Sequence, residues 1–498
     1  MVERPPRRPD EILMADQRHD TPREGTGNEA VRLIDERLGA APLMRKAMRY
    51  LFPDHWSFLI GEIALYSFLV LILTGVYLAL FFDDSTSTTV YHGSYAPLIG
   101  QTVSQAYAST VHISLDVPAG LLIRQTHHWA ALVFVAAIAV HLMRIFFTGA
   151  FRKPRDINWI IGLTLLILAL LEGFAGYSLP DDLLSGMGLA IGYGVALSIP
   201  VVGANLAFLI WGGQFPGSSS FEPRLYIAHV FILPALIGIL IAAHLAIIMR
   251  QKHSQFRGPG RREDNVVGTP LWPGYALRAT GLLFAVAGVL FLLGGLIQIN
   301  PIWQYGPFQP WVGTNGAQPD WYLGWLIGAL RLMPNWELHP FGYTLLPNPF
   351  FGGILFPGIV FTTLYAWPAI ERRKTGDRRR HDLLDRPRDS PWRTAVGAAF
   401  FVWVAIIFIA GSADRILVSV GISYVSQVWF FRVAAFFVPI LVFFLTRRIC
   451  RQLGTTEEHP LRGWTGVVVQ RNVAGGYEDL TAPKPDQAST VGPVRSDE

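Results

Sequence analysis

Four histidines in long apolar segments of the chain are spaced as they would be on one face of a helix. His127 and His141 are fourteen residues apart in one segment, and His229 and His244 are fifteen apart in another. In an α-helix, fourteen residues fall about 40° short of four turns, and fifteen pass four turns by about 60°. Each pair should therefore lie near one helix face, with its two rings about 21 or 22.5 Å apart along the axis.

A single histidine in such a helix is most often a packing residue, hydrogen-bonded to a neighbouring carbonyl. Two helices that run in the same direction, however, would place His127 opposite His229. The same arrangement would place His141 opposite His244. Facing imidazoles suit the axial ligation of haem iron, because each neutral ring offers one nitrogen. A zinc site would need more ligands at each level, and a proton relay would need steps shorter than about 20 Å. We therefore expect two haems, one for each pair.

Glycines in two other apolar segments occur with the same period. Gly61 and Gly75 are fourteen residues apart in the first segment, and Gly162 and Gly176 are fourteen apart in the third. Glycine is common at helix contacts in membranes for packing reasons alone. The spacing of these glycines matches that of the histidines, so they should lie at the same two depths as the two histidine pairs. This match favours a cofactor role, because the missing side chains leave room for a flat macrocycle at each depth.

Three arginines lie at the ends of the apolar segments, beside the histidine pairs: Arg124, Arg144 and Arg224. Arginines at such borders commonly extend their side chains toward the polar interface. Haem propionates would need cations at these depths. We therefore predict that the three arginines contribute to cofactor binding, with interfacial anchoring as the alternative.

The composition indicates that lipid surrounds most of the chain. Of its 498 residues, 51% are hydrophobic and only 15% are charged, against about 25% charged in soluble proteins. The single cysteine, Cys450, excludes an internal disulfide, an iron–sulfur or zinc cluster and a CxxCH haem attachment within the chain. The polar start predicts no secretory signal peptide. A net charge of +5 would suit nucleic acid, but the basic residues gather in alternate connections between the apolar segments.

Eight segments are long and apolar enough to cross a bilayer as helices. They are residues 56–82, 121–147, 157–177, 225–248, 275–297, 350–367, 392–409 and 428–445. Because the basic connections alternate with acidic or neutral ones, the basic connections and both termini should face the cytoplasm. We predict an all-α integral membrane protein with eight transmembrane helices, in which the first four form a haem-binding four-helix bundle.

The regions outside the spans differ in character. We expect a disordered cytoplasmic N-terminus (1–28), a cytoplasmic surface helix (29–51), the haem-binding four-helix domain (52–250), a C-terminal four-helix transmembrane domain (251–452) and a flexible cytoplasmic tail (453–498). Two long outward connections, 177–224 and 298–349, contain apolar residues between Pro and Gly clusters. We predict that both form short helices at the membrane surface and carry function.

The motifs resemble cytochrome b of quinol–cytochrome c reductases. The matching stretches are RQTHHW…HLMRIFFTGAFRKPR, GYSLPDD, RLYIAHVFILP…H and PDWY, spread over about residues 50–450. Spacings of fourteen and fifteen are similar to the chloroplast-type branch, but here all eight spans are fused in one chain. No cysteine precedes the first span, so that branch's additional covalent haem should be absent. Fusion, the basic loops and QKHSQFRGPGRRE resemble the actinobacterial respiratory type, which uses menaquinol.

The resemblance implies a quinol-oxidation site in the second long outward connection. The family's PEWY motif corresponds here to Pro319, Asp320, Trp321 and Tyr322, with Asp320 in the role of the glutamate that receives a proton from the quinol. GYSLPDD, with Pro180, would form the opposite wall. Apart from the family, Asp320 would be an ordinary loop acid.

Two other groups are candidates for quinone chemistry. Lys252 and His253 follow the last histidine of the fourth span and could serve a quinone-reduction site on the cytoplasmic side, or they could be an ordinary basic flank. Glu172 lies within the third span, where an acid is a functional candidate by default. It could relay a released proton outward or pack between helices.

The resemblance also implies partners and a mechanism. One electron from the quinol would leave through a Rieske iron–sulfur subunit toward a c-type cytochrome subunit, and the other would cross through two non-covalent b-type haems, low- and high-potential, to a cytoplasmic-side quinone. Proton release outside and uptake inside would contribute to the proton-motive force of a bacterial plasma membrane. The family further implies a dimeric complex and association with a terminal oxidase. No nucleic-acid partner is expected.

A proton- or metal-coupled secondary transporter without haem is the alternative. Transporters of this kind are commonly built from inverted repeats with interrupted helices. The two halves of this sequence show no such correspondence. A haem spectrum would separate the two hypotheses.

Overall fold

The computed structural model describes residues 37, 39, 41–313, 318–454, 467–471 and 477–480. Within them, eight helices are long and apolar enough to cross a membrane, which confirms the predicted all-α architecture. Their main helices are α4 (Leu59–Ala79), α6 (Gly120–Phe147), α7 (Asp156–Ser178), α11 (Leu233–Gln251), α12 (Ala276–Leu296), α16 (Phe356–Thr375), α17 (Pro391–Ser412) and α19 (Tyr424–Gly454). The predicted segment 1–28 lies outside the described residues; of 29–51, helix α3 (Ala41–Met48) is described.

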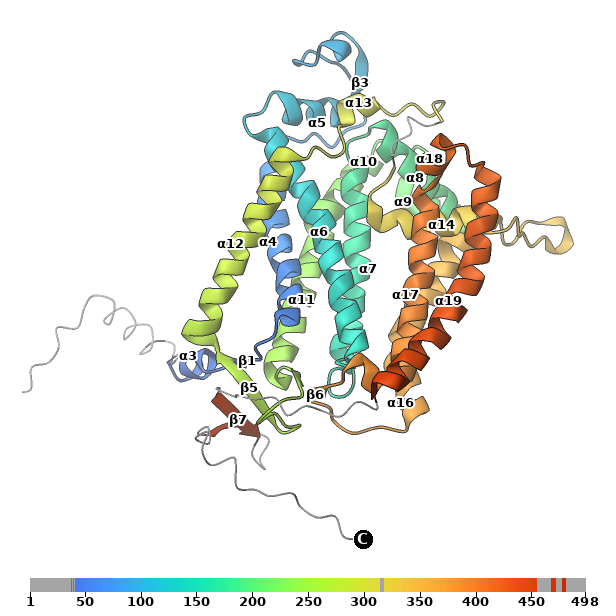
Figure 1. Cartoon of the computed structure of the whole chain (residues 1–498). Helices are drawn as coiled ribbons and strands as arrows, with labels where there is room; N and C mark the ends of the chain where they lie inside the picture. Colours follow the sequence, from blue (N-terminus) through green and yellow to red (C-terminus); the bar gives the residue numbers. More distant parts are fainter. Residues whose placement is uncertain are drawn as a thin grey trace, which may run out of the picture.

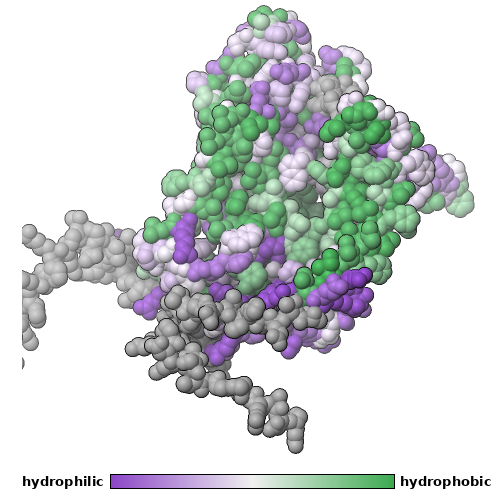
Figure 2. Space-filling model, in the orientation of Figure 1, coloured by the Kyte–Doolittle hydropathy of each residue, from purple (hydrophilic) through white to green (hydrophobic). Residues whose placement is uncertain are grey.

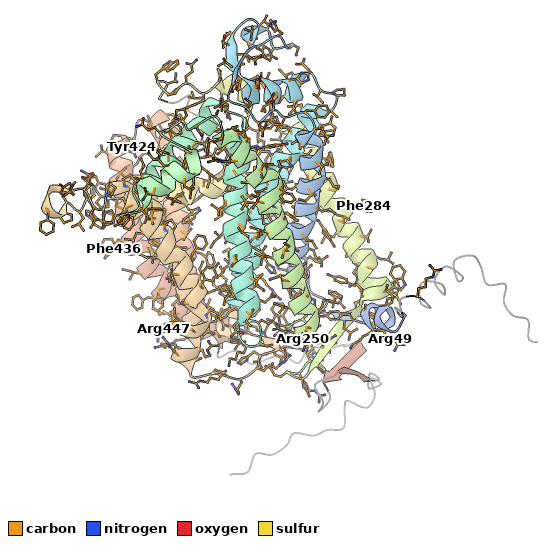
Figure 3. The ribbon with its side chains drawn as sticks, turned by 180° about the vertical axis from the view of Figure 1, so that it is seen from behind. Arg49, Arg250, Phe284, Tyr424, Phe436 and Arg447 are labelled. Atoms are coloured by element: carbon orange, nitrogen blue, oxygen red, sulfur yellow. The ribbon has the colours of Figure 1, made fainter. Side chains whose placement is uncertain are left out.

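On the face drawn in Figure 2, apolar side chains form a belt over the middle of the molecule, and a charged band lies along its lower edge. Large apolar side chains of the belt face outward, among them Phe284 and Phe436, which are 70% and 65% exposed. Arg49, Arg250 and Arg447 all lie at the charged side, here named the basic end, while Tyr424 lies at the opposite end (Figure 3). This arrangement agrees with the alternation of basic connections in the sequence.

The first four spans pack together, and the fifth packs on them. α4 lies against α6, α6 against α7, and α7 against α11, while α12 covers α4 and α6 (Figure 1). The predicted boundary at residue 250 differs from this, because it groups α12 with the later spans. The contacts of its last turns explain the placement: Gly294 packs on Thr126, and Trp129 Nε1 donates to the carbonyl of Ile297 (2.9 Å).

The last three spans form a second group beside the first. α17 packs against α19 and against α14 (Gly324–Leu332), and α16 packs against α7. At the basic end, the buried Arg393 donates to Glu371 (2.7 Å) and to Asp385 (2.8 Å). These bonds tie α16, α17 and the connection between them together, since a buried guanidinium requires such partners.

The connections at the end opposite the basic end contain the predicted short helices. The connection 177–224 forms α8 (Leu183–Leu197) and α9 (Gly203–Trp211). The connection 298–349 forms α13 (Ile302–Tyr305), η5 (Trp321–Leu323), α14 and η6 (Pro340–Gly342). A third connection carries the strand pair β2 (Thr88–Val90) and β3 (Thr102–Ser104), followed by α5 (Gln105–Leu115).

Short strands join distant segments at the basic end. β1 (Leu51–Phe52), β5 (Asn265–Pro270), β7 (Val467–Arg471) and β8 (Tyr477–Leu480) form an antiparallel sheet in that order, and β4 (Gln255–Phe256) pairs in parallel with β6 (Leu383–Leu384). Of the predicted flexible tail, 453–498, the structure describes residues 453–454 and the strands β7 and β8, and the flexibility of the tail stays a prediction. The residues of these strands include the β-branched run VVV, which favours strands.

Candidate functional site

The histidine pairs lie on α6 and on the fourth span, two helices that run in the same direction toward the basic end (Figure 1). The ring centroids of His127 and His229 are 6.2 Å apart, and the ring planes are inclined at 79°. His141 and His244 lie farther along the same two helices. The structure therefore brings the four residues to two levels, as the helical period predicts.

His229 lies in a π-helical turn, η3 (Ala228–Ile232), between α10 (Phe221–Ile227) and α11. Pro234 follows this turn; proline lacks an N–H and its ring clashes with the carbonyl four residues earlier. A π turn carries one residue more than an α-helical turn. The π turn accommodates the additional residue of the fifteen-residue spacing. The angle between His229 and His244 around the helix axis is therefore about the same as for two residues fourteen apart in a regular α-helix.

Each of the four predicted glycines lies against the imidazole of one histidine. A Cβ atom on Gly61 would lie 3.2 Å from Cε1 of His141, and one on Gly75 would lie 3.2 Å from Cε1 of His127. On α7, Gly162 faces His244 and Gly176 faces His229, with corresponding distances of 3.7 and 2.5 Å. The absence of side chains at these positions is therefore what admits the four rings between the helices.

The second ring nitrogen, Nδ1, differs in its surroundings at the two levels. His127 Nδ1 lies 2.9 Å from Thr74 Oγ1, and His229 Nδ1 lies 3.0 Å from Glu172 Oε1. In the described part of the chain, Nδ1 of His141, of His229 and of His244 is buried without an aligned hydrogen bond, and Nδ1 of His141 and of His244 also has no carboxylate beside it. The level nearer the outward connections is therefore the more polar of the two.

The predicted arginines do not share one environment. Arg124 donates to the carbonyl of Asn300 from both terminal nitrogens (3.2 Å each). Arg144 lies with its guanidinium carbon 4.2 Å from the ring centroid of Phe58, and its Nε and Nη2 are buried without a partner among the described residues. Arg224 is exposed and donates to a backbone carbonyl of α9 (3.4 Å). Arg144 therefore offers the clearest unsatisfied cation.

These features fit haem better than a metal ion alone. The gap between His127 and His229 is one that two metal–nitrogen bonds of about 2 Å each could span. No group of three or more His, Cys, Asp or Glu that could hold a metal ion occurs among the described residues. The unsatisfied guanidinium of Arg144 supplies charge for a large anionic cofactor, and the glycines admit the imidazoles that would hold it, while a direct contact of the glycines with the macrocycle stays a prediction.

The PDWY segment places its acid against a histidine of the first bundle. Asp320 Oδ1 lies 2.7 Å from Nε2 of His128, and the hydroxyl of Tyr322 donates to Asp320 Oδ2 (3.0 Å). Burial and the neighbouring Asp320 hold the pKa of Tyr322 well above its ordinary value, so this hydroxyl keeps its proton. Trp321 is 39% exposed. Asp320 is therefore held on both oxygens by named donors.

The remaining predicted residues of this site lie nearby in the fold. Helix η5, which follows Pro319 and Asp320, packs against α6 and α7. Pro180 follows the end of α7, and the next residues pair with the other long connection, where Phe308 N donates to the carbonyl of Asp181 (2.9 Å). The residues that follow Pro180 thus pair with 306–308, in the same long connection that carries the PDWY segment.

His128 is the functional candidate that the sequence interpretation missed. Its place directly after His127 turns it about 100° from the ligand face, which correctly excludes it as a partner of His229. That direction points it toward η5, and only the folded arrangement of the long connection shows that Asp320 is there. The second His of RQTHHW was the available signal.

The predicted quinone-reduction residues lie in an aromatic cluster at the basic end. The ring of His253 is 5.0 Å from that of Phe52, 6.0 Å from that of Tyr50 and 6.2 Å from that of Phe58. Lys252 Nζ lies 4.0 Å from the ring centroid of Tyr50. Burial and neighbouring cations lower the pKa of His253 to about 3. His253 is therefore neutral and suits hydrogen bonding better than proton storage.

Sequence relatives settle the family. The chain is 46% identical over 458 residues to a Streptomyces coelicolor protein named "Cytochrome bc1 complex cytochrome b subunit", covering 92% of this chain and 84% of the relative. A Mycobacterium tuberculosis protein of the same name is 47% identical over 463 residues, covering 93% and 82%. The chain belongs to the cytochrome b family. A Corynebacterium diphtheriae member is 47% identical over 439 residues, covering 87% and 80%, so the resemblance to the actinobacterial type is confirmed.

Two further comparisons agree with this assignment. The family model described as "Cytochrome b(N-terminal)/b6/petB" matches residues 132–307, which include three of the four histidines. A solved structure titled "Hyperthermophilic respiratory Complex III" has a TM-score of 0.61 at 21% identity, covering 85% of this chain and 99% of that one, and supports the fold. The chain is thus a multi-pass cytochrome b subunit of a bc1-type complex, a family with b-type haems and quinone substrates.

Proposed function

We propose that this cytochrome b subunit serves a respiratory menaquinol–cytochrome c reductase and holds two non-covalent haems. The observation that carries the proposal is the arrangement of four imidazoles at two levels, each against a glycine. His127 and His229 would hold one haem at the level nearer the outward connections, here called the outer haem. His141 and His244 would hold the other at the level nearer the basic end, here called the inner haem. Haems held in this way supply one-electron transfer between two depths of the membrane. Arg144 would pair with a propionate at the inner level.

At the outer end, Asp320 is the group that would accept a proton from the quinol hydroxyl. Its two oxygens are held by Tyr322 and His128, which fixes the direction of the carboxylate. Aspartate is one methylene shorter than the family's glutamate, and these two contacts support it from the protein side. A positioned base of this kind typically contributes a factor of 10²–10⁴ to a rate.

At the basic end, Lys252 and His253 would bind the quinone that is reduced. The neutral imidazole of His253 can exchange a hydrogen bond with a quinone oxygen, and the rings of Phe52 and Tyr50 offer apolar faces to a quinone ring. Lys252 supplies positive charge beside the same cluster. The basic end would then face the cytoplasm, with both termini, in a bacterial plasma membrane.

The family membership favours this function over the secondary transporter. A cytochrome b subunit requires partners for the rest of the reaction, because the single cysteine of this chain cannot hold an iron–sulfur cluster. The partners would be a Rieske iron–sulfur subunit and a c-type cytochrome subunit, in a dimeric complex associated with a terminal oxidase. Proton release at the outer end and uptake at the basic end would build proton-motive force.

A reduced-minus-oxidised spectrum of the complex purified from native membranes tests the proposal. We expect a b-type band and two extractable b haems per chain of this subunit, together with reduction of a c-type cytochrome by menaquinol. Quantification by haem extraction against subunit concentration gives the ratio. A preparation without b-type absorbance, or with no dependence of cytochrome reduction on quinol, would contradict it.

The glycines give a second prediction with an internal control. In Gly176→Ala, the new Cβ would lie 2.5 Å from His229, which is too close without a shift of the ring. In Gly162→Ala, the Cβ would lie 3.7 Å from His244, an ordinary contact. We expect G176A to lose about half or more of the outer haem, because one bulky addition in a tight site costs about 1–3 kcal/mol. G162A should keep both haems. Equal haem contents in the two variants would contradict the geometry.

A further inference from the structure

Glu172 is an acid on the membrane helix α7, six residues before the helix ends at Ser178, and its carboxylate lies against His229. Its Oε1 lies 3.0 Å from Nδ1 of His229, within hydrogen-bonding distance. The side chains of both residues are mostly buried, 17% and 16% exposed. An acid at this depth is costly unless it has a partner or a function, and the imidazole is the partner that the structure provides.

The four histidines are unequal in this respect. Nδ1 of His127 has the neutral hydroxyl of Thr74. In the part of the chain that the structure describes, Nδ1 of His141, of His229 and of His244 is buried without an aligned hydrogen bond, but of these three only Nδ1 of His229 lies beside a carboxylate. Only the outer level therefore combines an imidazole with a carboxyl group among these described contacts.

We propose that Glu172 accepts the Nδ1 proton of His229 and thereby lowers the reduction potential of the outer haem relative to the inner one. The proposal rests on the proposed function of the histidine pairs. An acceptor at the second nitrogen fixes the tautomer that leaves Nε2 free for iron and raises the basicity of that nitrogen. A more basic ligand favours the oxidised iron. Glu172 is thus a positioning and tuning residue that acts through His229.

The contact lies directly beside the quinol-oxidation residues. Gly173, the next residue on α7, packs so closely on Tyr322 that a Cβ there would lie 2.5 Å from the phenol oxygen. Tyr322 in turn donates to Asp320. Two successive residues of α7 therefore contact the two parts of the outer site: Glu172 contacts the haem ligand His229, and Gly173 contacts Tyr322 of the PDWY segment. Glu172 would thus tune the outer haem at the depth where the quinol would deliver its electrons.

Redox titration of the purified complex, with each haem followed by its own absorbance, tests this inference. In Glu172→Leu, which removes the acceptor, we expect the equilibrium between the two haems to shift about ten-fold toward the reduced outer haem, or about 59 mV for a one-electron couple. Glu172→Gln should shift it about three-fold, because an amide oxygen still accepts but more weakly than a charged group. The inner haem should keep its midpoint.

Glu222→Gln is the matched control, since Glu222 is a second buried acid in the same span as His229, and the ion pairs found among the described residues include Glu172 with His229 but not Glu222 with His229. It should leave both midpoints unchanged. Unchanged midpoints in both Glu172 variants, or an equal shift in E222Q, would overturn the inference while leaving the two-haem function intact. Loss of the outer haem from both Glu172 variants would also overturn it, because Glu172 would then serve assembly. A wild-type complex without haem would refute the proposed function itself.

Discussion

Replacement of Asp320 by asparagine should lower quinol oxidation about 100-fold while both haems remain bound. Asparagine has nearly the shape of aspartate and can still meet Tyr322 and His128, which hold the two carboxylate oxygens at 3.0 and 2.7 Å. An amide cannot take up a proton at neutral pH, so the change removes the chemistry and leaves the geometry. Steady-state reduction of a c-type cytochrome by a soluble quinol analogue measures the loss.

Two companion variants make this result specific. Glu337→Gln changes an exposed acid in the same connection, fifteen residues beyond the PDWY motif and 2.9 Å from His339, and should leave the rate unchanged. Asp320→Glu restores a proton acceptor with a longer side chain and should recover part of the rate. Wild-type turnover in D320N would remove Asp320 from the mechanism, and a parallel loss in E337Q would indicate a general effect of charge on this surface.

The spans were predictable from the sequence because their lengths and apolar content reflect the bilayer itself. Their ends were less so, and α19 shows the reason. The prediction ended the last span at residue 445, where Arg447 and Arg448 interrupt the apolar run, but the helix continues to Gly454. Arginine is a good helix former. A helix therefore passes out of the membrane without ending, and hydropathy alone detects only the crossing.

The histidine pairs were predictable because helical period is a local property. The π turn around His229 was not predicted, although the arithmetic contained a sign of it: ideal geometry leaves a spacing of fifteen about 60° past four turns. The proline two residues beyond the turn supplies the cause, since it removes a helical hydrogen bond. A discrepancy between spacing and ideal phase, followed by proline, is thus a usable signal for a π turn.

The contacts that refine the site depend on packing between distant segments. His128 meets Asp320 across 192 residues of sequence, and Glu172 meets His229 across 57. No periodicity within one helix can identify such pairs. The bond from Arg224 to a carbonyl of the surface helix α9 is a contact of the same kind, and the role of Arg224 in cofactor binding stays a prediction.

Substitution of His141 or of His244 by alanine should reduce the complex from two b haems per chain to one. Each residue would supply one of the two axial bonds at the inner level, and the glycine beside it leaves no other side chain to replace the lost nitrogen. The outer pair lies about 21 Å away along the helices and should keep its haem. Haem extraction and redox titration measure the number and identity of the remaining cofactor, and His112→Ala, in the exposed part of α5, serves as the control.

Double substitutions test which histidines hold the same haem. If His141 and His244 hold the same haem, the double variant must contain one haem per chain, as each single variant does, because the second change removes a ligand from a site that is already empty. If His141 is combined with His229 instead, both sites lose a ligand and the protein should contain none. Such non-additivity is expected of residues that share a partner, whereas distant sites without one are additive. A double variant of His141 and His244 without haem would therefore contradict the assignment of two levels, even if every single variant behaved as expected.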